Sequence, residues 1–204
     1  MGADSELQDA RARARERILD AFTEGARSAG PRNVVMAELA RDLGISTRTL
    51  YQHFPSKADL VAALMDRWAD EVQADHLART ASGRSPYEQM LSAAEGWLQG
   101  QCAFSASFWA QLERDFPEAF ARYQGRLRQI LDAGRRHLMP YIREDLDKDL
   151  ALALMQASLR VAADPERCDR LGLSRQEAVR QALEAWVRGT MRPVRAVHAP
   201  TEHD

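Results

Sequence analysis

Residues 43–60 of the chain read LGISTRTLYQHFPSKADL. A glycine and a proline bound a polar segment, residues 46–53, which is long enough for about two turns of helix. The preceding segment, VMAELARDL at residues 35–43, has the apolar spacing of another short helix. Helices this short are unstable alone in water, so both must pack against a neighbour. Two short helices joined by a glycine turn are typical of a helix-turn-helix, whose second helix enters the major groove of DNA.

The turn between the two short helices meets the requirements of that motif. Gly44 tolerates the positive φ of a tight turn, and Ala40 is small enough for the helices to approach closely. The apolar residues expected to hold the pair from inside are Leu39, Leu43, Ile45 and Leu50. No nucleophile motif or carboxylate pair stands at a recognisable spacing from His53, so we expect no catalytic residues. The simpler role for His53 is a structural hydrogen bond near the helix end.

The second short helix carries side chains that bond base edges and phosphates. Ser46 is placed to cap its N-terminus. The hydroxyls, guanidinium and amide that follow are suited to DNA. They belong to Thr47, Arg48, Thr49, Tyr51, Gln52 and His53. Lys57 begins the next helix, where its ammonium and the backbone N–H groups are placed to share a phosphate.

The rest of the chain also has helical periodicity, so the predicted class is all-α, with about nine helices. The further helices are expected at residues 6–29, 57–79, 86–101, 104–115, 117–138, 147–163 and 174–191. Three of them begin with capping boxes, Ser56–Asp59, Ser85–Glu88 and Ser174–Glu177. We expect a DNA-binding domain at 1–56, a connecting helix at 57–79, a ligand-binding and dimerisation domain at 80–192 and a disordered tail at 193–204.

The composition of the chain limits which other kinds of site and location are possible. The net charge is −2, and residues 1–60 hold nine basic and nine acidic groups, so any DNA-binding surface must be local. The two cysteines have no metal-ligand spacing, which favours a reducing cytoplasm with no metal or other cofactor. The charged N-terminus does not resemble a signal peptide, and no apolar run is long enough to span a membrane. Arg11, Arg13, Arg15 and Arg17 predict a solvated face of the first helix or, alternatively, an arm that contacts phosphates.

The stretch GISTRTLYQHFPSKADL resembles the signature of the TetR family of bacterial transcriptional regulators. The resemblance covers residues 10–72 and is most specific over 38–60. It implies that Thr47, Arg48 and Thr49 face the DNA groove. It also implies that Tyr51 and His53 bind backbone phosphates or brace the helix, and that Lys57 binds a phosphate. Leu50 and Phe54 would then be core residues. Family members often have a threonine at the start of the first short helix, where Asn33 is the nearest polar substitute here.

Half of the chain's 14 aromatic residues lie within residues 97–123. Plain core packing explains such a cluster, and an apolar pocket for a small hydrophobic or aromatic effector is the functional alternative. The candidate ligand-binding residues are Trp97, Gln101, Phe104, Phe108, Trp109, Phe116, Phe120, Tyr123 and Met155. Gly96 and Gly100 leave space on one helix face for a neighbouring helix or for a ligand.

The last two expected helices suggest a homodimer. Residues 147–163 are apolar almost all round, and 174–191 have one large apolar face. Two such helices from each of two chains would form a four-helix bundle that suits a palindromic operator. The predicted function is a ligand-responsive repressor that binds double-stranded DNA and is released by its effector, with no membrane partner. The alternative is a helical small-molecule binding protein whose head does not read DNA.

Overall fold

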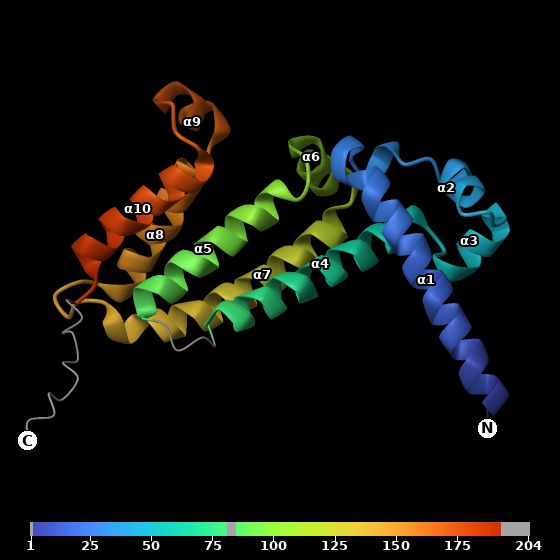
Figure 1. Cartoon of the computed structure of the whole chain (residues 1–204), viewed down its shortest axis with the longest axis horizontal. Helices are drawn as coiled ribbons and strands as arrows, with labels where there is room; N and C mark the ends of the chain where they lie inside the picture. Colours follow the sequence, from blue (N-terminus) through green and yellow to red (C-terminus); the bar gives the residue numbers. More distant parts are fainter. Residues whose placement is uncertain (1, 81–84, 193–204) are drawn as a thin grey trace, which may run out of the picture. The chain divides into compact units, whose positions relative to one another are not determined.

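The computed structural model describes residues 2–80 and 85–192, which contain ten α-helices and two short 3-10 helices (Figure 1). The first seven α-helices are α1 (Gly2–Ala29), α2 (Met36–Asp42), α3 (Thr47–His53), α4 (Lys57–Thr80), α5 (Pro86–Cys102), α6 (Ala106–Asp115) and α7 (Pro117–Leu138). The last three are α8 (Lys148–Ala162), α9 (Pro165–Leu171) and α10 (Arg175–Thr190), and the 3-10 helices are η1 (Pro31–Asn33) and η2 (Met139–Tyr141). The all-α prediction is confirmed for these residues. The tail expected to be disordered lies outside them.

Serine caps begin several of these helices, as the sequence predicts. The Ser56 hydroxyl accepts from the Asp59 N–H at 3.1 Å and donates to the Asp59 carboxylate at 2.7 Å. Ser85 and Glu88 form a full capping box, in which the Ser85 N–H donates to the Glu88 carboxylate at 2.9 Å. Each cap satisfies N–H groups that have no partner inside their helix, and so sets where the helix starts.

The described chain has one helix more than expected. The additional helix, α9, occupies residues predicted to connect the last two helices. Its start signals are local: Asp164 Oδ1 accepts from the Arg167 N–H at 2.8 Å, and Pro165 takes the first helical position. Gly172 ends it in the left-handed conformation, with φ +66°. Apart from Pro165, its seven residues, PERCDRL, include only two apolar side chains, Cys168 and Leu171, so they show no apolar periodicity.

The chain divides into two compact units. Unit 1 consists of Met1–Ala81 and Gly96–Leu131, and unit 2 of Ser82–Glu95 and Asp132–Asp204, so α5 and α7 each contribute to both. In unit 1 a single apolar core joins the N-terminal helices to α4, α6 and α7. Its fully buried large side chains include Phe22, Leu50, Phe54, Leu60, Val61, Phe108 and Leu112.

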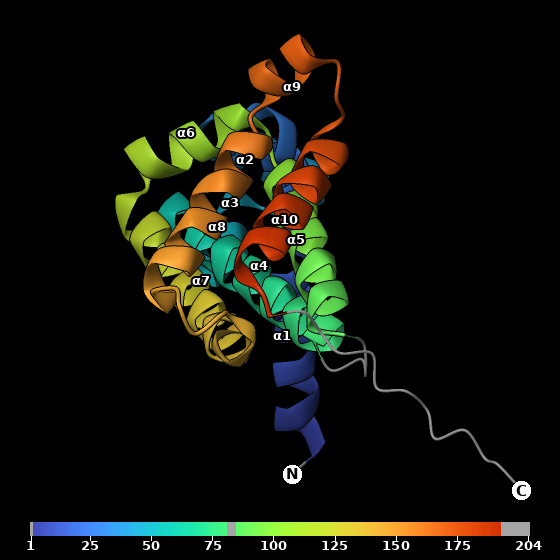
Figure 2. The same ribbon diagram turned by 90° about the vertical axis from the view of Figure 1, so that its left-hand side faces the viewer.

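Unit 2 is built around the pair α8 and α10, which lie side by side in both views of the chain (Figures 1 and 2). The buried residues of this unit include Ala151 and Leu152 of α8 and Leu183 and Trp186 of α10. The Trp186 indole N–H donates to the backbone oxygen of Ala151 at 2.8 Å. Among the described residues, none of the helices combines the length and the apolar character required to cross a bilayer.

Candidate nucleic-acid interface and ligand site

The α2–α3 turn has the geometry of a helix-turn-helix. Gly44, with φ +68°, donates its N–H to Arg41 O, and Ile45 donates to Ala40 O, both at 3.0 Å. These two bonds form a Schellman motif, which satisfies the last carbonyl groups of α2 and turns the chain sharply. Ala40 is buried between the helices, and Leu50 of α3 is fully buried. The predicted roles of Ala40, Gly44 and Leu50 in the turn are confirmed.

Helix α3 begins at a cap and presents a polar outer face. Ser46 Oγ accepts from the Thr49 N–H at 3.0 Å and shares a hydrogen bond with the Thr49 hydroxyl at 2.8 Å. The exposed residues of α3 are Thr47, Arg48, Tyr51 and Gln52. Because Leu50 anchors the opposite face in the core, these four side chains are held on the outside of a fixed helix.

The C-terminal end of α3 is held by an arginine from α1. Arg15 places its guanidinium 3.9 Å from the centroid of the Phe54 ring and donates to the backbone oxygen of His53 at 2.6 Å. The partial negative charge at the C-terminal end of a helix also favours a cation at this position. The arginine run of α1 is therefore not uniformly solvated, since Arg15 positions the end of α3. His53 itself is half-buried.

Two of the predicted DNA-binding residues bond to the protein backbone. Lys57 donates from Nζ to Arg32 O at 2.8 Å, and partial burial together with the charge of Arg32 lowers the pKa of Lys57. Asn33 donates from Nδ2 to Ala29 O at 2.8 Å, at the C-terminal end of α1. Asn33 therefore bonds to α1, although the sequence suggested it as a substitute at the start of α2. A phosphate contact by either residue stays a prediction.

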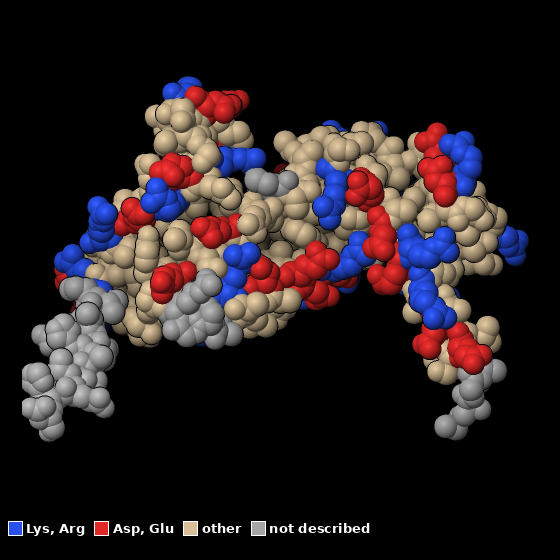
Figure 3. Space-filling view, viewed as in Figure 1, with Lys and Arg blue, Asp and Glu red and all other residues tan. Residues whose placement is uncertain are grey.

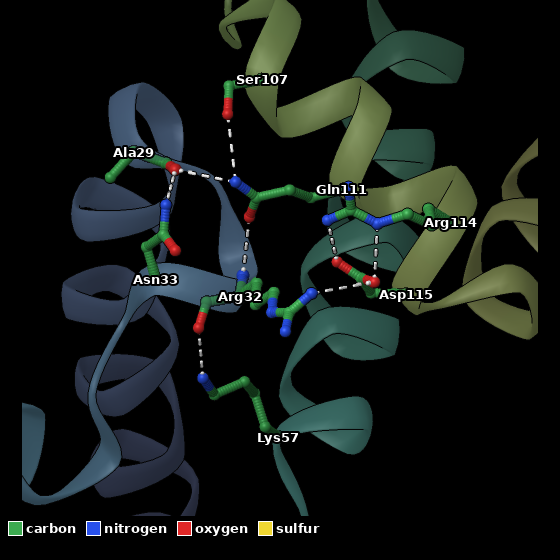
Figure 4. A network of polar contacts seen from close by, with 8 residues as sticks. All are labelled: Ala29, Arg32, Asn33, Lys57, Ser107, Gln111, Arg114 and Asp115. Atoms are coloured by element: carbon green, nitrogen blue, oxygen red, sulfur yellow. Dashed lines mark hydrogen bonds and ion pairs between the residues drawn. The ribbon is translucent and has the colours of Figure 1, made fainter.

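Figure 4 shows the polar network that joins α6 to the end of α1. The Gln111 side chain accepts from the Arg32 N–H at 3.0 Å and donates to Ala29 O at 3.2 Å and Ser107 Oγ at 3.0 Å. Gly30 makes this approach possible, because a Cβ there would lie 2.3 Å from Gln111 Oε1. The hydrogen bonds of Gln111 therefore hold η1 and the end of α1 against α6.

Aromatic residues of α4, α6 and α7 meet in the interior of unit 1. Phe104 lies at the centre, with ring centroids 5.2 Å from Trp68, 4.2 Å from Phe108 and 5.8 Å from Trp109. Trp109 in turn lies 5.6 Å from Tyr123. Four predicted ligand-binding residues are therefore in one cluster, together with Trp68 of α4, which is not among the predicted ligand-binding residues. We call these five residues the aromatic cluster.

The other predicted ligand-binding residues are not members of the aromatic cluster. Phe116 and Phe120 are half-buried and pack against the core of unit 1, and Trp97 is half-buried on α5. Met155 is half-buried on α8 in unit 2. The Gln101 side chain lies outside the described residues. A ligand contact by any of these residues stays a prediction.

The two glycines of α5 face different neighbours. A Cβ on Gly96 would lie 2.5 Å from the carboxylate of Asp75, which is paired with Arg79 at 2.6 Å on α4. The space at Gly96 is therefore filled by an ion pair of a neighbouring helix. A Cβ on Gly100 would lie 3.5 Å from Trp68, so this glycine borders the aromatic cluster. In the described part of the chain, no three His, Cys, Asp or Glu side chains gather closely enough to hold a metal ion.

These features define a helix-turn-helix protein with a further all-α region. The family model of bacterial regulatory proteins, tetR family, matches residues 18–64, which include α2, the turn and α3. Over 90 residues the chain is 32% identical to the HTH-type transcriptional repressor KstR of Rhodococcus jostii (strain RHA1), a match that covers 44% of this chain and 42% of that protein. The chain is thus matched to less than half the length of this curated relative.

Solved structures share the fold along most of the chain. A transcriptional regulator from Rhodococcus sp. Rha1 has a TM-score of 0.68 at 18% identity, covering 86% of this chain and 97% of that one. A transcriptional regulator from Saccharomonospora viridis, in complex with choline, has a TM-score of 0.63 at 21% identity, covering 89% and 99%. At these identities the likeness establishes the fold alone. The family match identifies residues 18–64 as a DNA-binding region of the kind found in bacterial regulatory proteins of the tetR family.

Proposed function

We propose that this protein is a transcriptional repressor that binds a palindromic operator as a homodimer and releases it when a small apolar or aromatic effector binds. The proposal rests on how α3 is held in place. Ser46 caps its N-terminus, Leu50 anchors it in the core, and Arg15 donates a hydrogen bond to the backbone at its C-terminal end. Its exposed arginine, amide and hydroxyl groups are those that read base edges and bind phosphates. A repressor of this kind would act in the cytoplasm.

The charge distribution supports specific rather than general DNA affinity. Acidic and basic side chains are interspersed on the face drawn in Figure 3. Non-specific binding depends on the number of phosphates that basic groups neutralise. A head with balanced charge therefore depends on a few placed contacts, of which Arg48 is the strongest candidate because a guanidinium bonds guanine with two hydrogen bonds.

An unpartnered apolar face on α8 supports the homodimer. Leu150, Leu154 and Val161 are 60%, 55% and 48% exposed, although Ala151 and Leu152 of the same helix are buried. These three lie at offsets 0, 4 and 11, so they share one side of α8. A second copy that packs its own α8 and α10 against this side would cover them. The resulting two-fold axis would place two α3 helices on successive turns of DNA, roughly 34–36 Å apart.

Helix α4 provides a direct physical link between effector and DNA. Leu60 and Val61, in its first turns, are fully buried in the core under the helix-turn-helix, and Trp68 lies two turns further along. A ligand that moves Trp68 therefore acts on the same rigid helix that supports α3. A preference of about 1–3 kcal/mol for the non-binding arrangement would change DNA occupancy 5–150-fold.

The test is selection of bound fragments from sheared genomic DNA at near-physiological salt. Wild-type protein is compared with an Arg48→Ala/Tyr51→Ala variant, in which both changes are on exposed positions of α3. The matched control is Arg170→Ala, an exposed arginine on α9. We expect wild type and control to recover one palindromic sequence, and the double variant to lose it.

Two outcomes would count against the proposal. If the double variant recovers the same palindrome with the same affinity, α3 does not read the operator. If wild type enriches no sequence, even after extraction of bound small molecules and refolding, the protein is a small-molecule binding protein with a head that does not read DNA.

A further inference from the structure

Two buried indole N–H groups lack a hydrogen-bond partner among the described residues, those of Trp68 and Trp109. More than nine in ten buried polar groups in native proteins are paired, and leaving one unpaired costs about 1–3 kcal/mol. A third tryptophan of the chain, Trp186, follows the rule by donating to Ala151 O. The two exceptions both belong to the aromatic cluster.

Tyr123 lies beside both unpaired donors. Its ring is 5.6 Å from that of Trp109, and the Trp68 N–H is close enough to act on the pKa of its hydroxyl. Burial raises the pKa of Tyr123, and the nearby Trp68 N–H only partly offsets this. The medium around the Tyr123 hydroxyl thus disfavours an anion. No hydrogen bond of ordinary geometry satisfies the Trp68 donor there.

We propose that the effector of this protein is a neutral lipophilic molecule with a carbonyl oxygen, which accepts hydrogen bonds from the indole N–H groups of Trp68 and Trp109. This inference rests on the proposed function and specifies the chemistry of its ligand. An indole N–H only donates, so its partner must carry an acceptor. The aromatic rings around these donors suit an apolar or aromatic body. A quaternary ammonium ion could lie against the same rings, but it would leave both donors unpaired.

The position of Trp109 connects this ligand to the DNA-binding head. Trp109 and Gln111 are two residues apart on α6, a helix of ten residues. Gln111 holds Arg32 and Ala29 at the end of α1, and the preceding Ser105 N–H donates to Arg27 O at 2.9 Å. A ligand that pulls on Trp109 therefore acts on the helix that is hydrogen-bonded to the head.

The test uses pairs of probes that differ only in the acceptor. The full-length protein is titrated by calorimetry with 2-acetylnaphthalene, which has a ketone, and with 2-ethylnaphthalene, which has the same shape without one. Phenyltrimethylammonium tests the cation alternative. The variants are Trp68→Phe and Trp109→Phe, which keep an aromatic ring and remove the donor. The matched control is Trp186→Phe on α10, where the donor is already bonded to Ala151 O. We expect wild type and control to prefer the ketone roughly tenfold, and each donor variant to lose most of that preference while binding the hydrocarbon as before.

Indole N–H signals in ¹⁵N–¹H spectra give a second readout. The signals of Trp68 and Trp109, assigned by their absence in the two Phe variants, should move downfield with the ketone and not with the hydrocarbon. The inference is overturned if the ketone has no advantage, if neither naphthalene probe binds up to its solubility limit, or if the ammonium ion binds more tightly. It is also overturned if both N–H signals are already downfield and protected without ligand, because structural water then satisfies them.

The outcome is independent of the DNA experiment. An operator without a ketone preference would refute only this ligand chemistry. If the protein prefers the ketone but recovers no operator, the proposed ligand site is supported and the proposed repressor function is refuted.

Discussion

Substitution of Gly30 by alanine should destabilise unit 1 through two separable effects. Gly30 has φ +88° and ψ 155°, a backbone conformation that only glycine adopts readily. Holding an alanine there costs about 1–3 kcal/mol. The added Cβ would also lie 2.3–2.6 Å from three atoms of the Gln111 side chain. Since Gln111 is buried, with 8% exposure, its side chain has to leave its present position.

The second effect can be estimated from the bonds that Gln111 makes. Its amide takes part in three hydrogen bonds, with Arg32 N, Ala29 O and Ser107 Oγ. At about 1 kcal/mol each, their loss adds about 2–3 kcal/mol. The total for Gly30→Ala is therefore about 3–6 kcal/mol. The matched control is Gly44→Ala: Gly44 also has a positive φ, +68°, but a Cβ added there would have no neighbour within 4 Å, so the cost should be about 1–2 kcal/mol.

The assay is urea unfolding followed by circular dichroism and by tryptophan fluorescence, with coincident transitions as the criterion for a single cooperative step. At a typical slope of about 2 kcal/mol per molar, Gly30→Ala should lower the midpoint by about 2 M and Gly44→Ala by less than about 1 M. In a Gln111→Ala background, Gly30→Ala should cost only the backbone part, about 2 kcal/mol. Equal costs for the two glycines, or no reduction in the Gln111→Ala background, would refute the steric argument.

Three further predictions concern other parts of the molecule. Arg15→Ala should lower the free energy of unfolding by about 0.5–1 kcal/mol and weaken operator binding several-fold in a gel-shift titration. The control Arg17→Ala should change neither quantity. If the two variants behave alike, Arg15 does not position the end of α3. If the proposed dimer forms through α8, Leu154→Glu should make the protein monomeric in sedimentation velocity, and Leu7→Glu, at another exposed leucine, should not. A dimeric Leu154→Glu protein would exclude this face of α8 as the dimer interface. Because burial raises the pKa of Tyr123 above its usual 10.0, the stability that its neutral form contributes should be complete below about pH 10 and lost as pH rises toward the folded-state value. The difference in unfolding free energy between wild type and Tyr123→Phe should therefore change above about pH 10, and a constant difference would show that the hydroxyl is not buried in the folded protein.

Local signals in the sequence were sufficient for the helix-turn-helix. Gly44, the Ser46 cap and the apolar spacing that ends at Leu50 all act within a few residues of one another. Their hydrogen bonds join positions three to five apart, such as Ile45 N to Ala40 O and Thr49 N to Ser46 Oγ. Such bonds form within one turn of the chain, so residue type and spacing determine them before the rest of the protein is considered.

Helix α9 marks the limit of periodicity as a signal. Its start at Asp164-Pro165 and its end at Gly172 follow known capping preferences, but seven residues show no repeated apolar face. A search for caps alone would have located it. The apolar face of α8, in contrast, was evident from composition, and its partial exposure in a single chain agrees with the expectation that a second chain covers it.

The sequence by itself therefore determined every described α-helix except α9, together with the caps, the turn and the outer face of α3, because these depend on residues close together in the chain. Tertiary structure alone decided which residues hold these helices in place. Arg15 meets His53 across 38 positions, and Gln111 meets Ala29 across 82. The tertiary structure also places Trp68 against Phe104, and it leaves the indole N–H groups of Trp68 and Trp109 without a partner among the described residues. Contacts of this kind depend on how helix surfaces fit when the core closes, and neither charge pattern nor periodicity along the chain contains that information.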